Sequence, residues 1–194
     1  MFALIVASAI AAASPATACA YDRDRLLSLD QNAFDQDLNG GWRALADKPG
    51  CRLAAADLLR DYRQAHHSTD RILFWHEGQL RAEAGKDQAA LALFEQSRAK
   101  EPDAFGWNLY VDGTIAFLRH DRAALQAARD KLAKVPKPAN FHPVTPDGKP
   151  MQIKWPPNLN VLDGFLHCFD RSYDFAYATP VCTQPLARIN VRKR

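Results

Sequence analysis

The sequence has none of the short motifs that identify a metal, phosphate or nucleophile site. Neither HExxH nor CxxC occurs, and no two of the six histidines are four residues apart, as two zinc ligands on one helix face would be. The only glycine pair, Gly40 and Gly41, precedes Trp42 rather than the Lys and Ser or Thr of a phosphate loop. No nucleophile-elbow motif is present. We therefore expect no metal, no cofactor and no enzymatic activity.

The sequence also lacks alternating apolar and polar runs of strand length. This absence predicts almost no sheet and an all-α fold. The 194 residues are 47% hydrophobic and 24% charged, which fits one ordinary globular domain.

Charge of one sign is not concentrated in the body of the chain. Four of the 25 basic residues lie in the tail 186–194, which leaves 21 basic residues against 22 acidic ones, a net charge of −1. Such a body has no electrostatic footprint for nucleic acid, so no nucleic-acid partner is expected. The tail is either a solvated terminus or a contact for anionic lipid or an acidic partner.

Residues 1–20 contain no charged side chain and form an apolar run too short for a comfortable membrane span. They predict a secretory signal peptide, although the usual basic residue near the start is missing. Small residues place the cleavage site before Cys19 or before Tyr21. An uncleaved anchor is the alternative. The expected location is therefore the periplasm or the outside of the cell.

Four cysteines allow three disulfide pairings, and export to an oxidising compartment favours their formation. Cys168 and Cys182 bracket the last helix-turn segment and are the first predicted pair. Cys19 and Cys51 then remain, and cleavage before Tyr21 would leave Cys51 as a free thiol. A third possibility is lipidation of Cys19, although Ala16 stands where bacterial lipoprotein signals prefer Leu.

Residues 71–104 have the spacing of one helix-turn-helix repeat of 34 residues. Gly78 and Ala90 supply two small helix contacts, Phe94 fills the core, and Pro102 stops the second helix. In this spacing the segment resembles a tetratricopeptide (TPR) repeat. It departs from the family at three positions, where Glu77 and Arg81 replace Leu and an aromatic residue and Ser97 replaces Ala.

The resemblance extends to the neighbouring segments, as a solenoid requires. In 105–138, Ala124, Ala128 and Pro136 follow the first repeat by 34 residues, while Gly113 follows Gly78 by 35. Upstream, an atypical terminal pair is expected around a turn at 48–50. The predicted TPR-like solenoid spans 21–138, and a non-repeat helical bundle is the alternative.

The chain beyond the repeats divides into three parts. Residues 139–157 belong to a stretch, 136–157, with seven of the twelve prolines, and apolar residues such as Trp155 predict an ordered, extended segment there. Residues 158–185 predict a C-terminal helical cap that begins near Asn158 or Asn160. The tail 186–194 follows.

The TPR resemblance implies a concave face, lined by the first helix of each pair, that binds a peptide or protein. The residues expected on that face are Trp75, Gln79, Ala82, Glu83, Trp107, Tyr110, Thr114 and Phe117. The alternative is that the aromatic residues belong to the core and are covered by the proline-rich segment.

The resulting hypothesis is an exported module that binds a protein or peptide partner in the cell envelope. One alternative is an envelope lipoprotein that assists assembly of a membrane complex. Membrane contact is expected only if Cys19 is lipidated or the signal remains uncleaved. A small envelope hydrolase is the other alternative, and it would need an acid and a histidine, such as Glu77 and His142, in one pocket.

Overall fold

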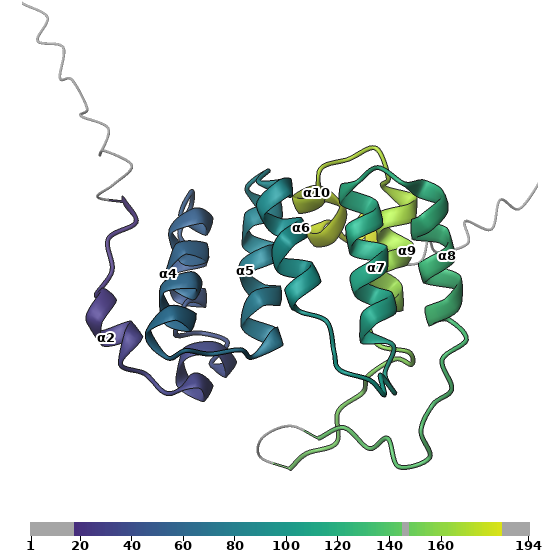
Figure 1. The fold of residues 1–194 in the computed structure, drawn as a ribbon, viewed down its shortest axis with the longest axis horizontal. Coiled ribbons are helices and arrows are strands. Elements are labelled where there is room, and N and C mark those ends of the chain that lie inside the picture. Colours follow the sequence, from purple (N-terminus) through teal and green to yellow (C-terminus); the bar gives the residue numbers. More distant parts are fainter. Residues whose placement is uncertain (1–17, 145–147, 184–194) are drawn as a thin grey trace, which may run out of the picture.

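The computed structural model describes residues 18–144 and 148–183, which are all-α. Within these ranges the extended chain contributes only one isolated β-bridge, between Val144 and Pro150, and no strand. The helices, labelled as in Figure 1, are α2 (Arg23–Leu27), the π-helix η1 (Asn32–Gln36), α3 (Arg43–Ala46), α4 (Arg52–Ala65), α5 (Arg71–Glu83), α6 (Asp87–Gln96), α7 (Trp107–Leu118), α8 (Arg122–Leu132), α9 (Leu159–His167), α10 (Tyr173–Ala178) and α11 (Pro180–Thr183).

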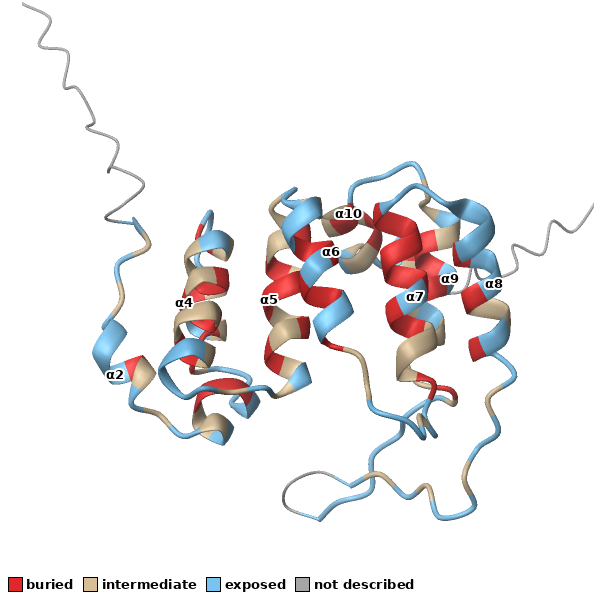
Figure 2. Ribbon diagram, viewed as in Figure 1, coloured by how far each residue is buried: buried red, intermediate tan, exposed pale blue. Residues whose placement is uncertain are grey.

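Two hydrophobic cores meet at α5. The first core lies among α2, η1, α3, α4 and α5, and the second joins α5 to α6, α7, α8, α9 and α10. Leu73 and Leu80 of α5 belong to the first core, whereas Trp75 and Ala82 belong to the second. Figure 2 shows the buried residues on the faces that neighbouring helices share. Helix α5 therefore connects the two halves of the molecule through opposite faces.

The helices α5 and α6 pack closely because Gly78 has no side chain. A Cβ at Gly78 would lie 2.8 Å from Cε1 of Phe94. The second helix of this pair ends at Gln96, well before Pro102, so Pro102 does not stop it as expected. Ser97 is the C-cap, and its hydroxyl donates to the Phe94 carbonyl at 2.7 Å. Gly113 of α7 serves a different contact, since a Cβ there would lie 2.6 Å from Leu162 of α9.

The chain before α4 is irregular, and it breaks at Gly40 and Gly41. Gly41 has φ +52°, and a Cβ on it would lie 1.9 Å from the Phe34 carbonyl oxygen. Helix α3 therefore begins as a separate four-residue turn. A disulfide joins Cys19 to Cys51 with Cα atoms 5.4 Å apart, so the first described residues are fixed at the start of α4.

The proline-rich segment packs at the end of the second core. Trp155 donates from Nε1 to the Val135 carbonyl at 2.8 Å, and its ring contacts Phe105 and Phe141. The segment does not cover the aromatic core as the sequence had suggested. Helices α9 and α10 do so, because α9 packs against α7 and α8 while α10 packs against α5.

A second disulfide holds the C-terminal helices. Cys168 at the end of α9 is bonded to Cys182 in α11, with Cα atoms 5.7 Å apart. Asn158 precedes α9 in a left-handed conformation, φ +64°, without a side-chain capping bond. Among the described residues, no helix has the length and apolar character needed to cross a membrane. The expected cleavage sites, before Cys19 and before Tyr21, lie within the first described residues, whereas residues 1–17 of the expected signal and the tail 186–194 lie outside the described range.

Candidate functional site

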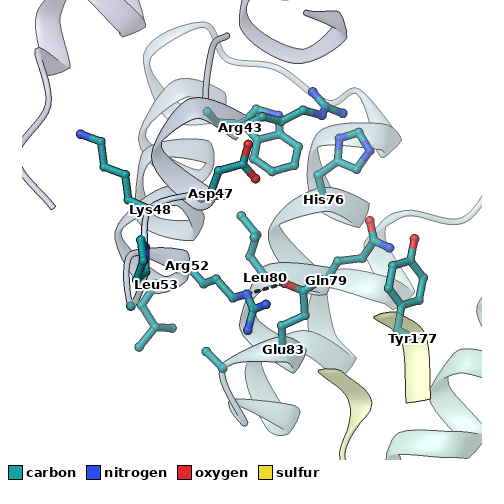
Figure 3. Close-up of a pocket in the computed structure, with 15 residues that line it drawn as sticks. Arg43, Asp47, Lys48, Arg52, Leu53, His76, Gln79, Leu80, Glu83 and Tyr177 are labelled. Carbon is teal, nitrogen blue, oxygen red and sulfur yellow. Dashed lines mark ion pairs between the residues drawn. The ribbon is translucent and has the colours of Figure 1, made fainter. Parts of the chain in front are cut away.

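A cleft of about 830 Å³ lies between α5, the α3–α4 connection and α10. One wall is a stripe on α5 formed by His76, Gln79, Leu80 and Glu83, whose spacing of three and four residues puts them on one helix face. Figure 3 shows these side chains with Tyr177 of α10 beside Gln79. The full lining is Trp42, Arg43, Ala46, Asp47, Lys48, Pro49, Gly50, Arg52, Leu53, His76, Gln79, Leu80, Glu83, Ala84 and Tyr177.

The opposite wall is the turn between α3 and α4, and three local features hold it. Gly50 adopts φ +78°, a conformation that favours glycine. Cys51 follows immediately and is bonded to Cys19. Lys48 donates from Nζ to the Ala20 carbonyl at 3.0 Å, so the N-terminal segment also holds this turn in place. The wall is therefore anchored although most of its residues are exposed.

A buried carboxylate orients His76 at one end of the cleft. Asp35, fully buried in η1, accepts hydrogen bonds from His76 Nδ1 at 2.7 Å and from Trp42 Nε1 at 2.9 Å. Arg43 donates to the Asp35 backbone carbonyl and lies 3.9 Å from its carboxylate. Burial raises the pKa of Asp35, but the His76 hydrogen bond and charge, Trp42 and Arg43 together lower it below its usual value. Asp35 is therefore an ionised anchor that fixes the imidazole.

Arg52, which also lines the cleft, pairs with acids from two other helices. Its guanidinium lies 3.1 Å from Glu83 of α5 and 3.0 Å from Asp174 of α10. Burial raises the pKa of Glu83, Arg52 lowers it and Asp174 raises it, with a raised pKa as the net result. Burial also raises the pKa of the Tyr177 hydroxyl. A hydrogen bond from Gln79 lowers this pKa and the Glu83 charge raises it, and the net result is a pKa above the usual tyrosine value.

The residues expected on a concave face divide into two groups. Gln79 and Glu83 line the cleft. Trp75, Tyr110 and Phe117 lie in the core with 3%, 2% and 2% of their surface exposed. Their rings are covered by the second core; for example, Phe117 stacks on Phe165 of α9 at 4.4 Å between centroids.

Trp107 is half-buried, and its side chain also makes contacts within the protein. Its Nε1 donates to the Ser97 carbonyl at 2.7 Å, and Arg71 lies over its ring at 4.7 Å. Of the two small positions expected on the same face, Ala82 belongs to the second core and Thr114 is buried, donating to the Tyr110 carbonyl at 2.9 Å. The structure thus brings two of the expected residues together at a cleft and uses the aromatic ones for packing.

The acid and histidine considered for a hydrolase do not share a pocket among the described residues. Glu77 is buried between α4 and α5 and pairs with Arg63 and Arg81. His142 is exposed and lines a separate hollow formed by the proline-rich segment. Over residues 18–144 and 148–183, no group of three or more His, Cys, Asp or Glu side chains is arranged to hold a metal ion.

Sequence reasoning missed the residues that complete the cleft. His76 stands three residues before Gln79, so the helical stripe already contained a signal for it. Asp35, Arg52 and Tyr177 come from other segments, and their approach to α5 depends on tertiary packing. No family model, curated protein or solved structure matches the chain.

Proposed function

We propose that this chain is an exported, TPR-like interaction module that binds an extended peptide segment of a protein partner in the cleft beside α5. The observation that carries the proposal is the stripe of His76, Gln79 and Glu83, which lines a cleft of about 830 Å³ opposite an anchored turn. A cleft of this volume is large enough for a ligand, and its lining offers charged and polar side chains beside apolar ones.

The TPR-like part of the proposal is supported by the pairing of α5 with α6 and of α7 with α8. Each pair is joined by a short turn, and Gly78 lies against Phe94 where the repeat spacing places a small residue and a core residue. Helix α4 packs on α5 and extends the array toward the N-terminus. In this arrangement, the peptide site uses the first helix of the better-matched pair.

Export is supported by the cysteines. All four are paired, Cys19 with Cys51 and Cys168 with Cys182, as expected in the periplasm or outside the cell. The lipoprotein alternative needs the Cys19 sulfur for a thioether-linked lipid, and that sulfur is bonded to Cys51. Intact mass of the envelope protein, measured with and without reduction, separates the disulfide-bonded form from the lipidated form.

Peptide selection with a cleft-filling variant tests the proposed function. A random peptide library would be selected on the wild-type chain and compared on Gln79→Trp, which places an indole in the cleft. Gln88→Trp, at an exposed position on α6, is the matched control. Selected peptides should bind wild type and Gln88→Trp equally and should lose at least roughly ten-fold affinity on Gln79→Trp, because the indole occupies their space. Peptides that bind all three proteins equally would refute the proposal.

Mapping by NMR supplies an independent readout. The backbone amides of 47–53 and 76–84 should shift on peptide addition, because these segments form the two walls of the cleft. Shifts confined to the proline-rich segment or to α8 would place binding elsewhere and would contradict the proposed site.

A further inference from the structure

We propose that the cleft recognises a basic side chain, Lys or Arg, of the bound peptide through Asp47 and the Nε2 atom of His76. This inference rests on the proposed function and adds the chemistry of the ligand. It follows from which polar groups in the cleft already have partners and which do not.

The cations that line the cleft are already engaged. Arg43 lies against the Asp35 carboxylate and donates to its backbone carbonyl. Arg52 pairs with Glu83 and Asp174, and Lys48 donates to a backbone carbonyl of the N-terminal segment. Arg43 and Arg52 thus have carboxylate partners, whereas Lys48 is held only by a backbone carbonyl. An acidic ligand would have to compete with existing ion pairs.

The Nε2 atom of His76 has no intramolecular hydrogen-bond partner in the described part of the chain. Asp35 accepts the Nδ1–H at 2.7 Å, so in the tautomer that carries its hydrogen on Nδ1 the other nitrogen, Nε2, is left to accept a hydrogen bond. The Asp35 carboxylate also has Arg43 at 3.9 Å, so it does not depend on His76 alone for a partner. His76 lines the cleft, where Nε2 can accept a hydrogen bond from a ligand.

Asp47 supplies the charge on the other wall. It is exposed at the end of α3, lines the cleft, and has neither an ion pair nor a side-chain hydrogen bond within residues 18–144 and 148–183. Figure 3 shows Asp47 and His76 extending from opposite sides of the cleft. A carboxylate and a ring nitrogen together can accept from a guanidinium or ammonium group, whose hydrogens are all donors. The apolar stem of that side chain would then lie along Trp42 and Leu80.

Peptide arrays on the full chain test this assignment. Capped ten-residue peptides would carry one fixed central residue, Lys, Arg, Gln, Met, Asp or Glu, with flanking residues drawn from one neutral set. Binding to the arrays would be measured for wild type and Gln79→Trp. The peptides that bind best would then be titrated in solution against wild type, Asp47→Asn and Asp47→Lys to measure their affinities. Asp24→Asn removes the same charge from an exposed position on α2, away from the cleft, and is the control.

Peptides with a central Lys or Arg should bind wild type more tightly than the Gln, Met, Asp and Glu peptides. They should lose this binding on Gln79→Trp, whose indole fills the cleft. Asp47→Asn should weaken them roughly two- to five-fold, the range of an exposed charge pair. Asp47→Lys should weaken them further, whereas Asp24→Asn should leave them unchanged. Added salt should reduce the preference for basic peptides.

The outcomes separate this inference from the proposed function. Binding that Gln79→Trp abolishes but that favours acidic or apolar peptides would overturn the basic-side-chain assignment and leave the peptide site standing. A preference for basic peptides that survives both Asp47 variants would also overturn the assignment. Binding unaffected by Gln79→Trp would overturn both proposals.

Discussion

Replacing Glu77 by Gln should destabilise the fold strongly, because this carboxylate joins α4 and α5 from a buried position. Its side chain is 3% exposed, and the partners Arg63 and Arg81 are 13% and 15% exposed. Arg81 donates from Nε to Glu77 Oε1 at 2.8 Å, and Arg63 donates to the other carboxylate oxygen. The amide would remove the negative charge that both guanidinium groups face.

Removing one partner from a buried ion pair costs about 3–5 kcal/mol, since the remaining charge stays buried. Here the loss should lie near the lower end, at about 3 kcal/mol. Arg81 keeps an ion pair with Asp57 at 3.1 Å, and the Arg63 guanidinium lies 3.9 Å from the centre of the Phe74 ring. The free energy of unfolding would be measured by urea denaturation followed by circular dichroism, with both disulfides intact.

Two further variants make the result interpretable. Glu95→Gln removes a carboxylate from a partly exposed pair with Arg98 and should cost no more than about 1 kcal/mol. Combining Glu77→Leu with Arg63→Met and Arg81→Met should recover most of the loss, because apolar side chains of similar size can replace a buried charge cluster. A Glu77→Gln loss no larger than that of Glu95→Gln would refute the structural role given to this cluster.

Three other predictions test the packing, the C-terminal disulfide and the buried acid. Gly78→Ala should lower the unfolding free energy in urea by about 1 kcal/mol, because overpacking against Phe94 outweighs the gain in helix propensity; a stabilised variant would contradict this. Replacing Cys168 and Cys182 by Ser should cost about 3 kcal/mol for a separation of 14 residues, measured in the same way, and an unchanged midpoint would contradict it. The pKa of Asp35 is lowered in the folded state, so its contribution is present above the unfolded value of about 3.9 and is lost as pH falls through the folded pKa. Urea titrations from pH 7 to pH 2 should therefore show a smaller loss of unfolding free energy in Asp35→Asn than in wild type, and equal losses would contradict this; Asp61, whose pKa is also lowered, titrates in both proteins.

Local sequence signals were sufficient for the helices around the best repeat. The stretch from Arg71 to Gln96 forms α5 and α6, and the glycine expected at their contact lies against Phe94. The break at Gly41 was also predictable, since its positive φ and close approach to the Phe34 carbonyl suit a residue without a Cβ. These features depend on residues that are near one another in sequence.

The burial of the aromatic residues could not be predicted from these local sequence signals. Trp75 contacts Phe94 of α6 and Tyr110 of α7, and both Trp75 and Tyr110 are buried in the second core, which includes α9 and α10. Apolar periodicity identifies a helix face that needs a partner but does not identify the partner. The proline-rich segment, which has its own apolar residues, packs instead against Val135 and Phe105.

The polar stripe of α5 lines the cleft because no long helix packs over it in the described part of the chain. Helix α4 covers the face with Leu73, and the second core covers the face with Trp75. Between these two faces, His76, Gln79 and Glu83 line the cleft, where Asp35 of η1 holds His76 and Arg52 of α4 pairs with Glu83. Helix α3 has only four residues, with Gly41 before it and the turn at 48–50 after it, and both glycines, Gly41 and Gly50, have positive φ. The same backbone breaks that prevent a regular first helix pair therefore create the space in which a peptide can bind.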